Sequence, residues 1–198
     1  MFWGIKGKTY LCVEFRLNVR MEKETQSPVY GRNVMEFVTV AVEYCTFLEH
    51  AEGKECLDFS DTMTKLLPLL YIKAATLPKY EILSEECYLE DFVTEENYNI
   101  VRANISIIMG EKDDYLDVFM EDMRYSDSPI LTTISENLAD IYQEVKNFAL
   151  RYKNAVDEEA GMNALAEVKE GFQYSWGQKM VNVLRALHEV RYGEADEY

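Results

Sequence analysis

Four residues of this 198-residue chain have side chains that could bind an anion or move a proton. Asp140 lies in a long segment of helical period, and Arg185 and His188 lie three residues apart in the last such segment, so they share a helix face. Tyr115 precedes both segments. Asp, His and Tyr are residue types that carry out general acid–base catalysis. With Arg185 they would equally form a polar pocket for a small anion or a peptide segment.

The same residues also have a structural interpretation, which we favour. Asp140 is the middle one of three carboxylates spaced four residues apart, where like charges repel, and Arg185 is a candidate for the cation that offsets them. An ion pair between Asp140 and Arg185, with His188 near a helix C-terminus, needs no ligand. Trp176 is expected to anchor the core. The candidate binding residues are therefore Asp140, Arg185, His188, Tyr115 and Trp176, and none is predicted to be catalytic.

Sequence motifs for nucleotide, zinc or nucleophilic chemistry are absent. The chain contains no G-x-x-x-x-G-K-[ST], G-x-G-x-x-G, H-E-x-x-H or G-x-S-x-G. Neither His50 nor His188 follows a Glu by three residues, as a di-iron helical bundle would need, and the acidic residues 113–117 lack the glycine of an EF-hand loop. We therefore expect no metal and no cofactor, and we consider an enzyme less favoured than a binding protein.

The formal net charge of −16 makes nucleic acid and anionic membranes poor partners. Residues 81–144 hold 17 acidic residues against Arg102, Lys112 and Arg124. This stretch is either a solvated helical face or a docking surface for a basic partner protein.

Four cysteines without a C-x-x-C pair indicate a reducing compartment, so we expect a cytoplasmic protein. Cys45 falls in an apolar helical stripe, where a thiol packs as a small hydrophobe. No apolar run approaches the roughly 20 residues that a membrane span needs. Residues 1–20 resemble no secretory signal, and we expect Met21 to be the natural start; a strand packed on the body is the alternative.

Apolar residues at helical spacing predict an all-α, single-domain bundle of five or six helices. The N-caps are expected at Asn33, Ser60, Thr94 and Thr133, and Pro68 predicts a kink or a later start in the second helix. The predicted helices cover about 34–52, 60–77, 95–109, 113–123, 134–156 and 158–191, the last with a bend near Gly171 or Gly177. The domain is expected at 31–192, between an N-terminal extension (1–30) and an acidic tail (193–198).

Several motifs resemble a bacterial family of cytosolic helical proteins, domain of unknown function family 5063. They are Phe37-x-x-x-Ala41-x-x-Tyr44-Cys45-x-x-Leu48-Glu49, Leu70-Tyr71-x-x-Ala74-x-x-Leu77-Pro78, Leu138-Ala139-Asp140-Ile141-Tyr142, Trp176-Gly177 and Leu184-Arg185-Ala186-Leu187-His188. The resemblance implies a compact helical fold over about Val34 to Tyr192 and supplies no activity. In that family a histidine often stands beside the Trp-Gly pair. Ser175 and Lys179 flank it here, which argues against a histidine-based site.

These observations favour a non-catalytic helical adaptor or regulatory module that binds a protein partner through a groove or its acidic surface. The rival hypothesis is a small-ligand-binding protein or small enzyme with a polar pocket around Asp140, Arg185 and His188. A homodimer with a structural role is a third class.

Overall fold

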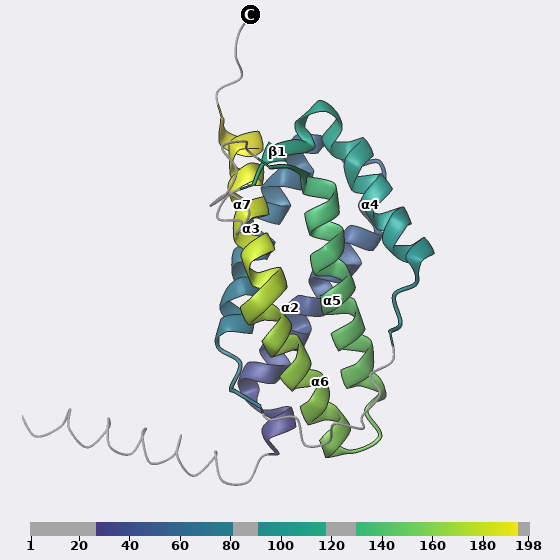
Figure 1. The fold of residues 1–198 in the computed structure, drawn as a ribbon, viewed down its shortest axis with the longest axis vertical. Helices are drawn as coiled ribbons and strands as arrows, with labels where there is room; N and C mark the ends of the chain where they lie inside the picture. The colour runs from purple at the N-terminus through teal and green to yellow at the C-terminus, as the bar shows by residue number, and fades with distance from the viewer. Residues whose placement is uncertain (1–26, 81–90, 118–129, 194–198) are drawn as a thin grey trace, which may run out of the picture.

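The computed structural model describes residues 27–80, 91–117 and 130–193. Its main elements are α2 (Arg32–Glu49), α3 (Cys56–Ala75), α4 (Glu95–Met109), α5 (Ile134–Asn154), α6 (Glu158–Gly171) and α7 (Gly177–Tyr192), with single-turn 3-10 helices η2 (Pro28–Tyr30) and η3 (Gly110–Lys112). The helices pack side by side along one long axis (Figure 1). The predicted all-α bundle is confirmed. The segment before Met21 and the acidic tail after Gly193 lie outside the described residues.

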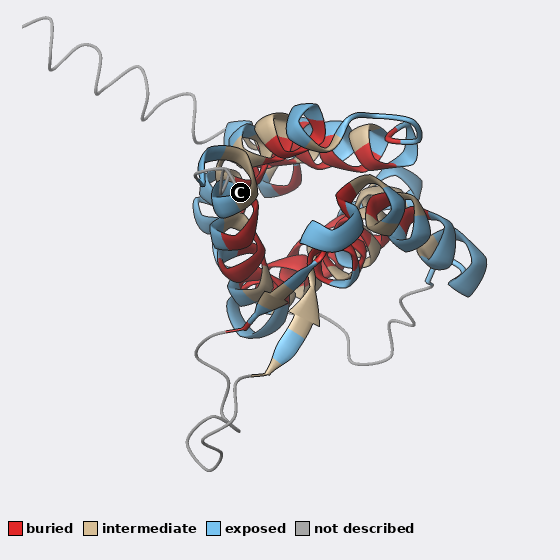
Figure 2. Ribbon diagram, turned by 90° about the horizontal axis from the view of Figure 1, so that it is seen from above, coloured by how far each residue is buried: buried red, intermediate tan, exposed pale blue. Residues whose placement is uncertain are grey.

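Helix α5 is central, because it contacts α2, α4, α6 and α7. The buried residues line the inner faces of the helices (Figure 2). The Tyr44 hydroxyl of α2 donates a hydrogen bond of 2.9 Å to the Leu138 carbonyl of α5, and the Phe37 and Phe148 rings lie 5.1 Å apart. The apolar residues at helical spacing in the predicted helix 134–156 are buried at Leu138, Ile141, Tyr142, Val145 and Phe148, and Tyr152 at its end is half-buried. The helical period therefore identified the core face of this helix correctly.

Cys45 is buried in the same core, and burial raises the pKa of its thiol to about 12. It is a free thiol that packs as a small apolar side chain, as expected.

Two predicted helix starts are confirmed. The Thr94 hydroxyl accepts a hydrogen bond from the Asn97 amide at 3.2 Å, and the Thr133 hydroxyl accepts one from the Glu136 amide at 3.1 Å. Helix α4 ends before Gly110, which has a φ of +55°, so the predicted range 95–109 is confirmed. Where a threonine stands directly before the apolar period, the local sequence is enough to set the start of the helix.

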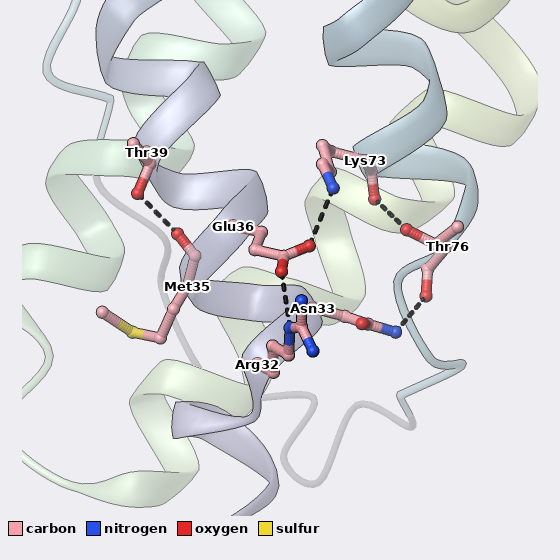
Figure 3. Close-up of polar contacts among 7 residues, drawn as sticks. All are labelled: Arg32, Asn33, Met35, Glu36, Thr39, Lys73 and Thr76. Carbon is pink, nitrogen blue, oxygen red and sulfur yellow. Dashed lines mark hydrogen bonds and ion pairs between the residues drawn. The ribbon is translucent and has the colours of Figure 1, made fainter.

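The predicted cap at Asn33 is wrong. Helix α2 begins two residues earlier, after Gly31, and the Asn33 amide reaches across to the Thr76 carbonyl at 3.1 Å (Figure 3). In the same cluster Lys73 pairs with Glu36 at 2.7 Å. Asn33 therefore satisfies a free carbonyl at the end of α3 instead of a free amide at the start of α2.

The predicted cap at Ser60 and the later helix start are also wrong. Helix α3 begins at Cys56 and runs through Pro68 to Ala75, and Ser60 is buried within it. An internal proline costs about 3 kcal/mol. That cost is offset by tertiary packing, since Met63, Leu67, Leu70 and Ala74 along the same helix are all buried.

The acidic helix predicted at 113–123 is wrong where the structure describes it. Residues Asp114–Leu116 form β1, which pairs antiparallel with β2 (Leu131–Thr133) in the register Asp114 to Thr133. Residues 118–123 lie outside the described residues. The Asp113 carboxylate accepts hydrogen bonds from the Ser135 amide at 2.8 Å and its hydroxyl at 2.7 Å. Contacts with the start of α5, which is distant in the sequence, thus fix this segment. A contact of this kind leaves no pattern in the local sequence, so the prediction missed it.

The interruption predicted near Gly171 or Gly177 is a π-helical turn, Phe172–Trp176, between α6 and α7. A Cβ at Gly177 would lie 2.2 Å from the Phe172 carbonyl oxygen, and one at Gly171 would lie 3.1 Å from the Trp176 ring. Glycine at these positions lets the wide turn close and lets the indole pack on the backbone. Turns of this kind often occur at functional sites.

Lys169 of α6 ties this region to α3. Its buried ammonium donates to the Ala74 and Ala75 carbonyls at 2.9 and 3.0 Å, and burial lowers its pKa. These carbonyls lie at the negative end of the α3 dipole, so the lysine stabilises the helix end.

Candidate functional site

The ion pair predicted between Asp140 and Arg185 is wrong. The Asp140 carboxylate accepts from the Tyr98 hydroxyl at 2.7 Å and pairs with Lys179 of α7. Arg185 instead donates to the Leu116 carbonyl of β1 at 2.7 Å. The repeat of carboxylates every four residues on α5 indicated that a cation lies nearby. The packing of α5 on α7 brings Lys179, not Arg185, to that position.

The other predicted residues are also separated. His188 is exposed and its ring lies 4.8 Å from that of Tyr192. It stands nine residues beyond Lys179, which is about 13 Å along a helix. Trp176 is buried, as expected of a core anchor. In the described part of the chain no hydrogen bond joins either histidine to a carboxylate, and no cluster of His, Cys, Asp or Glu could hold a metal ion.

Three of the five predicted site residues line two separate clefts: Tyr115 and Arg185 line one, and Asp140 lines the other. The first, called here the end cleft, has a volume of about 700 Å³ and lies between the start of α3, β1 and the end of α7. It is lined by two of the predicted residues, Arg185 and Tyr115. Pockets of this size are typical of ligand sites in proteins.

The end cleft combines apolar and cationic side chains. Leu57 and Leu116 line it and are 52% and 51% exposed. Three cations, Lys112, Arg185 and Arg191, also line it, together with the carboxylates of Asp114 and Glu189. Arg191 pairs with Asp61 at 3.1 Å, whereas Lys112 has no ion-pair partner among the described residues. The lining therefore carries one more cation than carboxylates, whereas the chain as a whole has a net charge of −16.

The second, called here the α5–α7 cleft, has a volume of about 460 Å³. It lies between β2, α5, the π-helical turn and the first half of α7, and Asp140 is one of its lining residues. Most of its lining residues are polar, and three of them are more than nine-tenths buried: Asp117, Asn137 and Asn182. The Asn182 amide donates to the Asp117 carboxylate across the cleft. Buried polar groups with fixed partners give such a site a rigid shape.

Asn137 and Tyr115 form the wall between the two clefts. The Asn137 amide nitrogen donates to the Tyr115 hydroxyl at 2.8 Å, to the Thr132 hydroxyl at 3.0 Å and to the Thr133 carbonyl at 3.1 Å. Tyr115 lines the end cleft and Asn137 lines the α5–α7 cleft. Burial raises the pKa of Tyr115, and the nearby Asp117 raises it further, so its hydroxyl stays neutral.

A smaller pocket of about 180 Å³ adjoins the α5–α7 cleft and shares Asp140, Ser175 and Lys179 with it. It is lined by Trp176, whose indole nitrogen is buried and has no partner among the described residues. Burial raises the pKa of Glu144 at this pocket, and nearby Glu167 raises it further. The carboxylate of Glu144 on α5 is therefore repelled by that of Glu167 on α6.

Sequence analysis did not identify Asn137, Asn182, Asp117 or Lys179 as site residues. Each asparagine lies beside apolar core positions of its helix, and a polar residue in an apolar stripe was the available signal. Asp117 and Lys179 gave no comparable signal, because only the pairing of β1 and the offset between α5 and α7 bring them to the cleft.

The protein is a helical bundle whose last helix, α7, borders two separate clefts, the end cleft and the α5–α7 cleft. None of its helices, over the residues described, is long and apolar enough to cross a membrane. The chain belongs to the family described as Domain of unknown function (DUF5063), whose model matches residues 28–193.

The solved structures include a similar chain, the crystal structure of protein BF1032 from Bacteroides fragilis. It is 43% identical, the similarity covers 86% of this chain and 99% of that one, and the TM-score is 0.76. No curated protein matches the sequence.

Proposed function

We propose that this protein is a non-catalytic binding module that docks a segment of a partner protein in the end cleft. One observation carries the proposal: in a strongly acidic protein, exposed leucines lie in a cleft whose lining has more cations than carboxylates, with Lys112, Arg185 and Arg191 against Asp114 and Glu189. The partner segment is expected to be short, with apolar side chains and at least one carboxylate.

The chemistry of the cleft supports this occupant. Leu57 and Leu116 each expose about half of their surface, and covering apolar surface contributes about 25 cal/mol per Å². Arg185 and Lys112 would attract carboxylates, and Arg185 is held in place by its bond to the Leu116 carbonyl. Long cationic side chains at a rim contribute mainly to the specificity and the rate of association.

The rival hypothesis rested on Asp140, Arg185 and His188 acting together. These residues have different partners and lie at different positions along the bundle, so an acid–base site built from all three has no geometric support. A reducing, cytoplasmic setting belongs to the proposal, since Cys45 and Cys56 are free thiols.

The experiment is a peptide-display selection against the wild-type protein, followed by fluorescence polarisation with the selected peptides. We expect enrichment of peptides that carry both acidic and apolar residues. The variants Leu57→Asp and Arg185→Glu should weaken binding at least about tenfold, the size of effect of a charge-assisted contact.

Matched controls lie on α4, where Ile107→Asp and Arg102→Glu make the same chemical changes on exposed side chains outside the cleft. Binding should stay within about twofold of wild type in both controls. Equal losses in cleft and control variants would contradict the proposal, since they would indicate a general charge effect.

A further inference from the structure

The polypeptide leaves the fold at the end cleft. Helix α7 ends at Tyr192, and the next residue, Gly193, is one of the residues that line the cleft. The Gly193 amide donates to the Glu189 carbonyl at 2.7 Å, and its ψ of 144° turns the backbone from helical to extended. Strand β1, on the other side of the cleft, lies at the same end of the bundle (Figure 1). The residues that follow Gly193 therefore start beside the cleft.

These residues have the chemistry expected of an occupant of this cleft. Residues 194–198 read Glu-Ala-Asp-Glu-Tyr, which combines three carboxylates with one aromatic side chain. The cleft offers Lys112 and Arg185 to the carboxylates, and its half-exposed leucines to the aromatic ring. Hydrogen bonds between ionised groups are stronger than neutral ones, and tyrosine buries a large apolar area at an interface.

Charge also favours this cleft over the rest of the surface. The chain has a net charge of −16, so an acidic segment is repelled by the protein as a whole. The lining of the end cleft, in contrast, has more cations than carboxylates. Neither Lys112 nor Arg185 forms an ion pair within the described ranges, and Arg185 donates only to a backbone carbonyl there. Both cations therefore keep N–H groups for a carboxylate.

The segment is long enough to reach these cations. Arg185 lies eight residues before Gly193, which is about 12 Å along a helix. Five residues of extended chain span up to about 17 Å. A segment tethered at the edge of its site has an effective concentration in the millimolar range, so it occupies the site even when each contact is weak.

We infer that residues 194–198 bind in the end cleft of their own chain and compete there with the partner segment. The inference rests on the proposed function, since it concerns the regulation of the same cleft. A partner would bind only when its segment displaces this tethered competitor. Acidic peptides that bind weakly would then be rejected, which sharpens the selectivity of the cleft.

The test compares the full chain with a variant that lacks residues 194–198, called here Δ194–198. The family model ends at residue 193, so the deletion leaves the whole domain in place. Two-dimensional NMR without a partner should show shifts at the backbone amides of Lys112, Tyr115 and Leu116, which are distant from the deletion in the sequence. The synthetic peptide Gly-Glu-Ala-Asp-Glu-Tyr, added to Δ194–198, should reverse these shifts. It should fail to do so when Δ194–198 also carries Arg185→Glu.

The peptides selected by display provide a second measurement. They should bind Δ194–198 at least about fivefold more tightly than the full chain, because the tethered competitor is absent. The triple variant Glu194→Gln/Asp196→Asn/Glu197→Gln should give a similar gain, since its tail has lost the charge-assisted contacts. A matched control, Glu43→Gln/Glu52→Gln/Glu170→Gln, removes three carboxylates from exposed positions outside the cleft. The control should change the affinity by less than about twofold.

Two results would overturn the inference. They are unchanged amides of Lys112, Tyr115 and Leu116 after the deletion, and an equal gain of affinity in the tail variant and its control. Selected peptides that bind the full chain and Δ194–198 equally would also overturn it, but would leave the proposed function in place. Peptides that bind neither protein, together with amide shifts that the added tail peptide reverses, would instead overturn the proposed function and support the tail contact.

Discussion

The end cleft and the α5–α7 cleft lie in succession along one stripe of α7, yet different side chains line them. Gln178 and Asn182 face the α5–α7 cleft, and Arg185 and Glu189, further along the same stripe, face the end cleft. The first cleft has buried amides and carboxylates whose positions are fixed by hydrogen bonds. The second has exposed leucines, three long cationic side chains and the carboxylates of Asp114 and Glu189. A rigid polar wall suits a small ligand, whereas adaptable side chains around apolar surface suit a partner protein.

Strand β1 divides this stripe into two sites. Leu116 lines the end cleft and the next residue, Asp117, lines the α5–α7 cleft. The strand is held by Arg185, which donates to the Leu116 carbonyl, and by the bond between Asn137 and Tyr115. A short pairing of three residues from distant parts of the chain thus creates two different environments along one helix.

The largest expected effect concerns stability beneath the α5–α7 cleft. Trp176→Ala should lower the free energy of unfolding by about 3–5 kcal/mol, because it removes a fully buried ring that packs 5.0 Å from Phe172. Urea unfolding followed by circular dichroism measures this loss. Tyr174→Ala in the same turn is the control and should change stability by less than about 0.5 kcal/mol, since that ring is exposed. Similar losses in both variants would show that the turn itself, not indole burial, sets the stability.

An intermediate effect is expected at the wall between the clefts. Tyr115→Phe removes the hydroxyl that accepts from Asn137 at 2.8 Å and should cost about 1 kcal/mol. The Asn137 side-chain amide resonance should move as well. Thermal unfolding and NMR measure the two changes. Tyr192→Phe, on an exposed ring, serves as the control. An unmoved Asn137 resonance would mean that the two clefts do not share this bond in solution.

The smallest effect concerns the carboxylates along α5. Burial raises the pKa of Glu144 above its unfolded value, so the folded state binds this proton more tightly and the contribution of Glu144 to stability falls as pH rises through the two pKa values. Glu144→Gln should therefore be more stable than wild type at pH 7 by a fraction of about 1 kcal/mol, because the side chain is exposed enough to be screened.

The gain should disappear near pH 3, where the carboxyl is protonated in both folded and unfolded states. Chemical unfolding at several pH values measures it. The same gain at pH 3 and pH 7 would rule out the electrostatic cause.

The sequence by itself determined the helices and their core faces. Thr94, Thr133 and Gly110 set helix ends through contacts with residues three or four positions away, and the apolar stripe of α5 is buried as its period predicts. These features depend on local backbone geometry, which a single segment encodes.

Only the tertiary structure decided which groups meet. Asp140 pairs with Lys179 and not with Arg185, Asn33 reaches α3 in place of capping α2, and Asp114–Leu116 form a strand. The physical reason is that a helical pattern fixes which residues share a face but not the axial offset between neighbouring helices. Lys179 and Arg185 are six residues apart, which is about 9 Å along a helix, so the axial offset between α5 and α7 decides which of them reaches Asp140.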